Sequence, residues 1–287
     1  MKVSIGLPVY NGSKYIGEAI ESILAQTYGD FELIISDNAS TDDTEEVCRS
    51  YNDNRIRYYR SDKNRGAAWN YNRTESMANG EYFKWAAHDD KLSPDFLSKC
   101  IPHLDRNDDV VLVYTNSIII DKEGNITGHF DQSLDASSHD PWFRFKNLIL
   151  KQHPCLSFFG LIRRKALLGT ARHGNYNSAD RVFLAHMSLK GKLVQIPEYL
   201  FYWRKHPEQS IRMVKDRYAY ALWFDPANAG KKVYPNLRLI KEYKSIIKQE
   251  EKSMRFKDRM LCRIALQRCY LKKFSKICKE ILKGGYG

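Results

Sequence analysis

The chain has 287 residues, of which 43% are hydrophobic, enough to bury a sizeable core in one large domain. Its formal net charge of +12 comes from the C-terminal end, because residues 231–287 hold 17 Lys or Arg against 5 Asp or Glu while residues 1–230 hold 29 of each. A balanced body argues against a broad basic face for nucleic acid, and no apolar run approaches the ~20 residues that cross a bilayer.

The first part of the chain alternates strand-like and helix-like segments. Continuous apolar runs predict buried parallel strands, and apolar residues spaced three and four apart predict helices. The expected strands are 2–9, 31–36, 56–60, 82–87 and 110–114, and the expected helices are 13–26, 40–51, 67–78 and 94–104. The helix at 40–51 opens with a segment that resembles a capping box with Asp in place of Glu. This alternation predicts an α/β fold with a doubly wound, mainly parallel sheet.

After about residue 115 the regular alternation ends. We expect helices at 141–151 and 180–190 and strands at 117–121, 157–163, 193–196 and 199–204, a mixed region that completes the sheet and builds the second half of a cleft. From Leu237 onward, apolar residues recur three or four apart among lysines and arginines, which predicts amphipathic helices. The apolar positions include Leu261, Ile264, Leu271, Phe274, Ile277 and Ile281.

Cysteine spacing and the N-terminus indicate the compartment. The six cysteines show no metal-ligand spacing, and several fall in expected helices, which is typical of reduced thiols in a cytosolic protein. Met1 leads directly into a strand, so the sequence predicts no signal peptide and a cytoplasmic location.

Polar segments follow four of the expected strands, at residues 8–12, 37–42, 64–66 and 88–90. Any one of them alone is typical of a turn or a helix cap. Because the carboxyl ends of parallel strands meet at one edge of a sheet, where ligands bind, we expect the four segments to converge. The adjacent carboxylates of Asp89 and Asp90 are hard oxygen ligands, which a Mg²⁺ or Mn²⁺ ion carrying a diphosphate requires.

In order and spacing, these segments resemble the inverting family-two glycosyltransferases with the glycosyltransferase A fold. The matching residues are Pro8, Tyr10, Asn11, Asp37, Ser40, Asp42, Asn64, Gly66, Asn72, Gly80, Glu81, Tyr82, Asp89 and Asp90. The resemblance implies a Rossmann-like sheet with an acceptor-side α+β region and a C-terminal basic helical extension. It divides the chain into a nucleotide-sugar-binding half at 1–115, an acceptor-binding and catalytic half of the same domain at 116–230, and a basic amphipathic tail at 231–287.

The resemblance also implies roles for the donor-site residues. Asp37 binds the nucleobase, usually uracil, and the backbone at Pro8, Val9 and Tyr10 lines the base pocket beside Asn11. Asp89 lies by the ribose and diphosphate, and Asp90 holds Mn²⁺ or Mg²⁺. Asn64 and Asn72 belong to the same nucleotide-sugar site. Arg65 and Arg204 are assigned to it on chemical grounds, because a guanidinium can counter phosphate charge.

Two further residues are assigned in the second half. Residues 202–206 resemble a late family segment whose histidine completes the metal–diphosphate site, which makes His206 a metal ligand. Residues 178–180 stand where the family has Glu-Asp at a helix start, which makes Asp180 the candidate general base, although Ala179 departs from the acidic residue expected there. The alternative for Asp180 is a cap of its helix paired with Arg181. We expect His88 to pack beside the aspartate pair.

The predicted function is metal-dependent transfer of a sugar, with inversion, from a nucleotide-diphosphate sugar to an acceptor hydroxyl. The expected partners are that donor, usually a UDP sugar, and a saccharide or lipid-linked saccharide acceptor of surface-polysaccharide synthesis. One alternative is a nucleotidyltransferase, which would ordinarily carry a glycine-rich loop with Lys or Arg after the first strand. Another is a basic nucleic-acid-binding protein, but the tail lacks a recognition motif, so no nucleic acid is expected.

The basic tail has two interpretations. Residues 237–283 can lie on an anionic membrane surface, which would give the protein a peripheral position on the inner face of the membrane. Alternatively, the tail is a helical cap whose apolar stripe packs on the catalytic domain while its lysines face water.

Overall fold

Apolar strands and amphipathic helices build an α/β domain in the computed structural model, which describes residues 1–209 and 216–286. The first part forms as its hydrophobic pattern predicts, with every residue of the first two strands buried. Its elements are β1 (Val3–Val9), α1 (Ser13–Leu24), β2 (Phe31–Asp37), α2 (Thr44–Arg49), β3 (Ile56–Arg60), α3 (Ala67–Ser76), β4 (Tyr82–Trp85), β5 (Lys91–Leu92) and α4 (Phe96–Asp105).

The later strands are longer and fewer than the sequence predicts. Expected strands on either side of residue 116 are one strand, β6 (Val110–Ile120), and those on either side of residue 197 are one strand, β9 (Lys192–Arg204). The expected strand at 157–163 is instead a 3₁₀ turn, η1 (Leu156–Phe159), followed by β8 (Leu161–Arg163). The other elements are β7 (Ile126–Phe130), α5 (Pro141–Leu150), α6 (Arg164–Leu167), α7 (Ala179–Lys190), α9 (Arg217–Phe224), η2 (Pro226–Asn228), α10 (Pro235–Gln249) and α11 (Phe256–Leu282).

The strands form one curled sheet in the order β3-β2-β1-β4-β8-β6-β9-β5, with β7 paired to β6. Strands β1 to β4 are mutually parallel where they pair, whereas β8 runs antiparallel between β4 and β6. The predicted doubly wound, mainly parallel sheet is therefore confirmed. Because β4 is central, the loop that follows it lies at the middle of the carboxyl edge.

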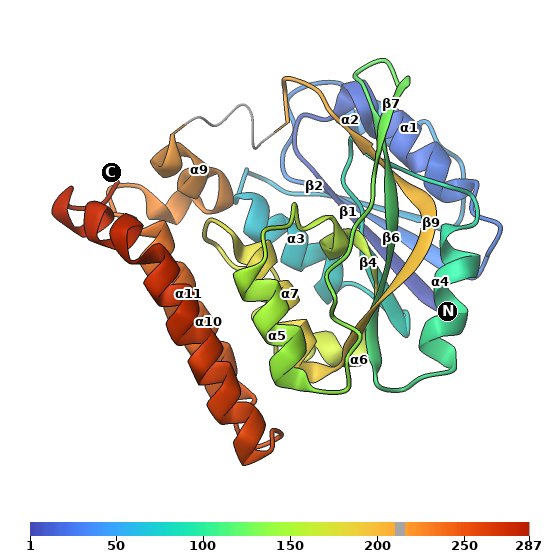
Figure 1. Cartoon of the computed structure of the whole chain (residues 1–287). Helices are drawn as coiled ribbons and strands as arrows, with labels where there is room; N and C mark the ends of the chain where they lie inside the picture. Colours follow the sequence, from blue (N-terminus) through green and yellow to red (C-terminus); the bar gives the residue numbers. More distant parts are fainter. Residues whose placement is uncertain (210–215, 287) are drawn as a thin grey trace.

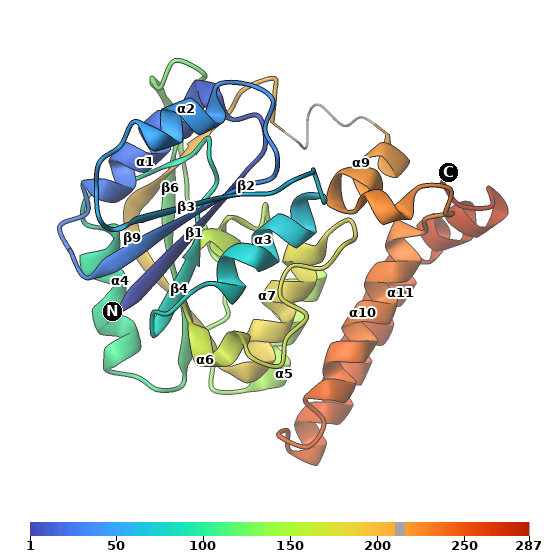
Figure 2. The ribbon, with the colours of Figure 1, turned by 180° about the vertical axis from the view of Figure 1, so that it is seen from behind.

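Helices cover both faces of the sheet, as Figures 1 and 2 show from opposite sides. One core cluster joins β1 and β2 to α1 and α4, through residues such as Ile5, Ile20 and Leu97. A second cluster joins the other face to α7, through residues such as Trp85, Phe158 and Phe183.

The C-terminal tail is a helical hairpin of α10 and α11 that extends along one side of the domain (Figure 1). It packs on α5 and α7 through a third cluster that includes Phe145, Val182, Tyr243, Ile246 and Cys262. Among the helices of residues 1–209 and 216–286, none combines the length and the apolar character that crossing a bilayer requires.

Candidate functional site

The loops after β1 and β2 are bound to each other side by side. Val9 and Asp37 end the two strands in register. Asn11 adopts a positive φ of 52°, which Asn tolerates better than most residues, and its backbone N–H donates to Ser40 Oγ at 2.9 Å. Ser40 therefore does not cap a helix as the sequence suggests, and α2 begins only at Thr44. The hydroxyl holds the first strand-end loop against the second instead.

Asp37 is fully buried at the end of β2. Its Oδ1 accepts a hydrogen bond from the Ser40 N–H at 2.7 Å, and its Oδ2 accepts one from the Tyr58 hydroxyl at 2.7 Å. Arg60 Nε lies 3.7 Å from Oδ2. Burial and then the hydrogen bond to Asp37 raise the pKa of the Tyr58 phenol, so it stays a donor. In this arrangement the carboxylate fixes the loop, with two of its lone pairs already engaged. Pro8 and Val9 are buried above it, while Tyr10 is 42% exposed.

The loop before α3 is held by Asn38, a residue that the sequence did not single out. Its Oδ1 accepts from the Arg65 N–H at 3.0 Å, and its Nδ2 donates to Asn64 Oδ1 at 2.9 Å. The Arg65 guanidinium pairs with Asp62 at 2.8 Å and lies over the Trp69 ring. Asn64 thus shapes the loop, and the Arg65 charge lies at the surface.

Two asparagines of α3 have different partners. Asn70 Nδ2 donates to the carbonyls of Val9 at 3.2 Å and Ser36 at 2.8 Å, so Asn70 contacts the ends of β1 and β2. Asn72 binds the backbone of His173 through both side-chain atoms, at 2.9 and 3.0 Å. Asn72 therefore anchors the loop before α7, and Asn70, which the sequence analysis did not single out, is the asparagine of α3 that contacts the strand ends.

The aspartate pair after β4 is held by Arg204, the last residue of β9, and by His206 just after it. Asp90 Oδ1 accepts from the Arg204 N–H at 2.9 Å, and Asp89 Oδ2 lies 2.9 Å from His206 Nε2. The Arg204 guanidinium is fully buried; it donates to the Asp89 carbonyl at 2.8 Å and to Glu18 Oε2 at 2.8 Å. Arg204 thus holds the aspartate pair in place from the protein interior, and its guanidinium does not face solvent. His88 packs against Gly12, as a Cβ there would meet its ring at 2.6 Å.

The pKa values of the two carboxylates are shifted in opposite directions. Burial and then the neighbouring Asp89 charge raise the pKa of Asp90 well above its ordinary value. Burial alone would also raise the pKa of Asp89, but the hydrogen bond from His206 together with the charges of His88 and His206 outweighs it, so the pKa is lowered. A buried carboxylate whose neighbour is charged favours either a proton or a cation.

This donor set fits a divalent ion that carries a diphosphate. Within residues 1–209 and 216–286, no cluster of three or more His, Cys, Asp or Glu side chains is arranged around one point. Mg²⁺ and Mn²⁺ sites that share their ion with substrate phosphates commonly use only one or two carboxylates, which Asp89 and Asp90 provide. His206 is 3% exposed, and its Nδ1 has no hydrogen-bond partner in the described part of the chain.

Asp180 begins α7, and burial raises its pKa above the ordinary value. Its Oδ1 accepts from the Arg181 N–H at 2.8 Å, while the Arg181 guanidinium donates to the carbonyls of Lys151 at 2.8 Å and His153 at 3.1 Å. No Asp180–Arg181 side-chain pair is therefore formed among the described residues. A carboxylate with a raised pKa is a stronger base than a solvated one, as general-base catalysis requires.

Two tyrosines that the sequence analysis missed are affected electrostatically by Asp180. Burial, and further the charges of Asp89, Asp90 and Asp180, raise the pKa of Tyr71, so all three carboxylates act electrostatically on one tyrosine. Burial and then Asp180 likewise raise the pKa of Tyr220 on α9. Neither tyrosine lies at a strand end, so no sequence signal pointed to it.

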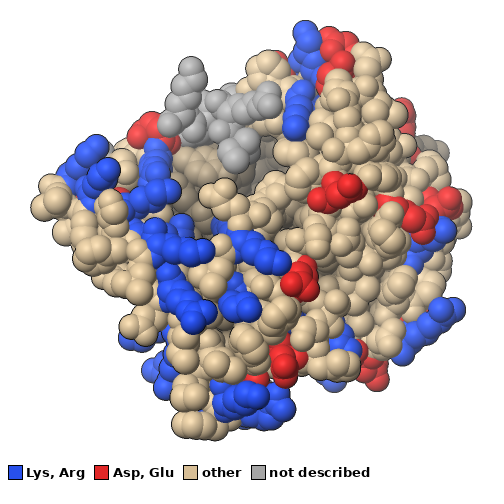
Figure 3. Space-filling model, in the orientation of Figure 1, with Lys and Arg blue, Asp and Glu red and all other residues tan. Residues whose placement is uncertain are grey.

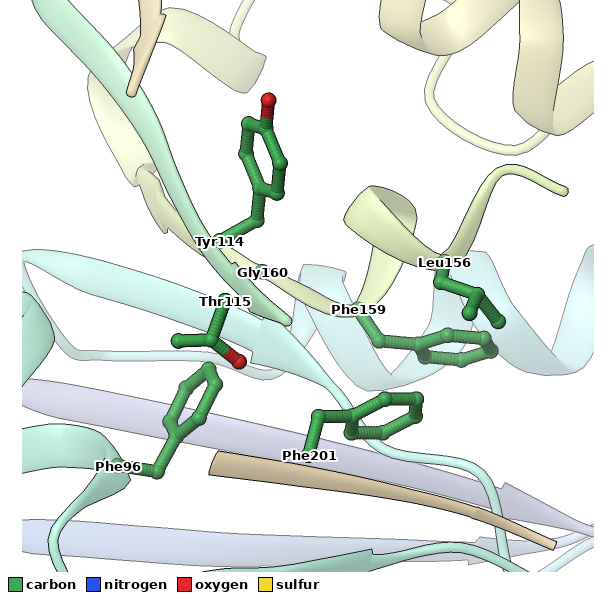
Figure 4. Close-up of a pocket in the computed structure, with 7 residues that line it drawn as sticks. All are labelled: Phe96, Tyr114, Thr115, Leu156, Phe159, Gly160 and Phe201. Carbon is green, nitrogen blue, oxygen red and sulfur yellow. The ribbon is translucent and has the colours of Figure 1, made fainter. Parts of the chain in front are cut away.

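Lys84 is a buried amine behind the aspartate pair. It lies between the rings of Phe96 and Phe201 and donates to the Phe159 carbonyl. Burial lowers its pKa to about 7. The nearby cavity in Figure 4, lined by residues such as Phe96, Phe159 and Phe201, has about 10 Å³, room for one water at most. This interior cavity is therefore too small to hold a sugar nucleotide.

Solved structures identify the fold class. The chain is similar to residues 1–349 of TarS from S. aureus in complex with UDP, with a TM-score of 0.58 and 16% identity over 100% of this chain and 93% of that one. It also resembles the mannosyltransferase PcManGT from Pyrobaculum calidifontis in complex with GDP-Man and Mn²⁺, with a TM-score of 0.52 and 15% identity over 99% and 79% of the chains. At these identities the likeness extends to the fold, which is of the glycosyltransferase A type.

Sequence relatives narrow the class to a family. A family model described as glycosyl transferase family 2 matches residues 4–170, so the chain belongs to that family. It is 40% identical over 124 residues to an uncharacterized glycosyltransferase of Rickettsia typhi, an alignment that covers 43% of this chain and 38% of that protein. It is 38% identical over 126 residues to the chondroitin synthase of Escherichia coli, covering 43% and 18%. The matches thus span well under half the length of these relatives.

Proposed function

We propose that the protein transfers a sugar from a nucleoside-diphosphate sugar, in the first instance a UDP sugar, to a hydroxyl of a saccharide or lipid-linked saccharide. The observation that carries this proposal is the buried aspartate pair at the carboxyl edge of the sheet, where Asp90 Oδ1 accepts from the Arg204 N–H and Asp89 Oδ2 lies 2.9 Å from His206 Nε2. The UDP and UDP-GlcNAc complexes of TarS support the donor class. The similarity to a chondroitin synthase supports polysaccharide synthesis as the setting.

The donor would lie along the ends of β1, β2 and β4. The adjoining loops of Pro8–Asn11 and Asp37 would receive the base, with Asp37 offering its remaining lone pairs and Tyr10 its exposed ring. Asn64 and Asn72 would keep the α3 loop and the loop before α7 at the edge of this pocket. The Arg65 charge at the rim would attract the phosphates.

Asp90, with Asp89 and His206 beside it, would hold Mn²⁺ or Mg²⁺. Bound there, the ion would supply Lewis-acid stabilisation of the departing diphosphate. Arg204 keeps both carboxylates in place through its backbone N–H to Asp90 and its guanidinium to the Asp89 carbonyl. The carboxylates thus need little reorganisation on donor binding.

Asp180 would act as the general base. Its carboxylate accepts the proton of the acceptor hydroxyl while the hydroxyl oxygen bonds to the anomeric carbon and the carbon–oxygen bond to the diphosphate breaks. A single displacement of this kind inverts the anomeric centre. The raised pKa of Asp180 makes the carboxylate more basic, which favours this transfer.

A thermal-shift panel of nucleoside diphosphates, each with and without Mn²⁺, tests the donor site. We expect UDP to stabilise the protein by about 2.7 kcal/mol at a hundredfold excess over its dissociation constant, and only when Mn²⁺ is present. Asp90→Asn should abolish this metal-dependent shift. Asp108→Asn, a matched change of an exposed aspartate, should retain it. If no nucleotide gives a metal-dependent shift, the proposal is wrong.

A further inference from the structure

Helix α11 has an inner face that packs on the domain. That face is made of small and medium residues, Cys262, Ala265, Cys269 and Ile277, each no more than 2% exposed. They join the cluster formed with α5, α7 and α10 or pack beside it, so one apolar face of the tail does cap the catalytic domain. The large residues of α10, including Leu239, Tyr243 and Ile246, are buried in the same cluster.

A second apolar stripe follows the outer side of α11. Met260 is 48% exposed, Ile264 40%, Leu271 63%, Phe274 49% and Ile281 54%. Their spacing of three, four or seven residues puts them on one side of the helix, within an arc of about 100° whose centre lies about 160° from that of the inner face. The two faces come nearest at Ile277, which is three residues after Phe274 and four before Ile281. Phe256 and Leu282 extend the stripe to the helix ends, at 71% and 86% exposed. A helix of 27 residues is about 40 Å long, so the stripe is far larger than a lone surface side chain.

The exposed charge that α11 itself carries around this stripe is of one sign, and the one acid that pairs with Arg259 and Arg263, Glu251, precedes the helix. The only acidic residues of α11, Asp258 and Glu280, are each 1% exposed and point inward, where they pair with Arg255 and Arg217. Basic side chains flank the stripe, and several gather over the tail in Figure 3. Within the part of the chain that the structure describes, five of these form no ion pair: Lys257, Arg268, Lys272, Lys276 and Lys279.

This charge pattern decides between possible occupants of the stripe. A second copy of α11 would bring two sets of unpaired cations together without an exposed acid on either helix to oppose them, and like charges beside a helical seam disfavour pairing. An anionic lipid surface offers both an apolar layer for the stripe and negative headgroups for its flanks. Helix α11 carries too many charged residues to span a membrane.

We propose that the outer face of α11 lies on an anionic membrane surface, with Met260, Ile264, Leu271, Phe274 and Ile281 inserted among the lipids and the flanking lysines and arginines on the headgroups. This narrows the binding surface of the tail from residues 237–283 to one face of one helix. It is independent of the reaction at Asp90 and Asp180, so either proposal can fail without the other.

The test is co-sedimentation of the full-length protein with phosphatidylcholine vesicles that contain or lack phosphatidylglycerol. We expect binding only to the anionic vesicles, with a loss in ~0.5 M salt, where screening is strong. The double variant L271E/F274E should bind at least about tenfold more weakly, because it removes two inserted side chains and adds two repelled charges. Both residues are exposed, so its melting temperature and UDP–Mn²⁺ thermal shift should match those of the wild type.

The matched control is I126E/L168E, which makes the same change in charge at two apolar side chains that are 61% and 55% exposed and lie outside α11. It should bind vesicles like the wild type. Equal loss of binding in both double variants would overturn the assignment to α11, as would wild-type protein that leaves anionic vesicles unbound. A concentration-dependent dimer that L271E/F274E dissolves, without vesicle binding, would also overturn it in favour of a second copy.

Discussion

Replacing Asp180 with Asn separates a catalytic role from a structural one. The pKa of Asp180 is raised by burial, so the folded protein binds this proton more tightly than the unfolded chain does. Stability from such a group is fully present below the unfolded pKa and is lost as the pH rises through the folded pKa. At neutral pH the ionised carboxylate therefore costs folding free energy, and Asn removes that cost. The Asn oxygen can still accept the Arg181 N–H, now 2.8 Å from Oδ1.

Asp180→Asn should thus keep or raise the melting temperature at pH 7 while it removes the base. Loss of a general base lowers the rate by about 10²–10⁴-fold, or about 2.7–5.4 kcal/mol of transition-state stabilisation. The assay is UDP release from a panel of UDP sugars with Mn²⁺, beside thermal melts at pH 7 and at a pH low enough to protonate Asp180. The stability difference from the wild type should shrink at the lower pH. A variant that melts earlier yet releases UDP at the wild-type rate would refute the reasoning and make Asp180 a helix cap.

Two buried carboxylates elsewhere give further predictions. Glu280 accepts N–H groups of Asn236 at the start of α10 and pairs with Arg217, so Glu280→Ala should lower the unfolding free energy by about 3 kcal/mol in urea titrations. An unchanged midpoint would show that the α10–α11 contact contributes nothing there. Burial alone would raise the pKa of Glu32, but hydrogen bonds from Ser4 and Arg57 lower it on balance, so its stabilisation is lost as the pH falls below about 4.5. Acid melts of Glu32→Gln should be flatter than those of the wild type; parallel curves would contradict this.

The first part of the fold was predictable because its signals are local. Apolar runs and helical periodicity depend on neighbouring residues, so the first strand ends at Val9 as expected, and the second and fourth end within two residues of the expected positions, at Asp37 and Trp85. The merged strands were not predictable. β6 and β9 continue through irregular pairing near Asn116, where register shifts absorb residues that read as turns in the sequence. Whether such a residue ends a strand depends on the neighbouring strand, which lies far away in the chain.

Within the candidate site too, the features that depend on local sequence were predictable and the contacts between distant segments were not. The sequence pattern found the carboxylates at the strand ends, but it gave no signal for the contact of Asn70 with the ends of β1 and β2, and it could not foresee that the Arg204 guanidinium is buried behind Asp89. It also gave no signal for Tyr71 and Tyr220, whose pKa values the Asp180 charge helps to raise. Hydrogen-bond partners and burial are set by segments distant in sequence, so only the folded chain assigns them.

The basic tail shows separately what the sequence determines and what the tertiary structure determines. By itself, the sequence determined that residues after Leu237 form amphipathic helices with an excess of positive charge, because periodicity and composition are properties of the chain. Only the tertiary structure decided which face is buried. Close packing on the domain selects the small residues Cys262, Ala265 and Cys269, which let the helix approach its neighbours, and leaves Leu271 and Phe274 outside.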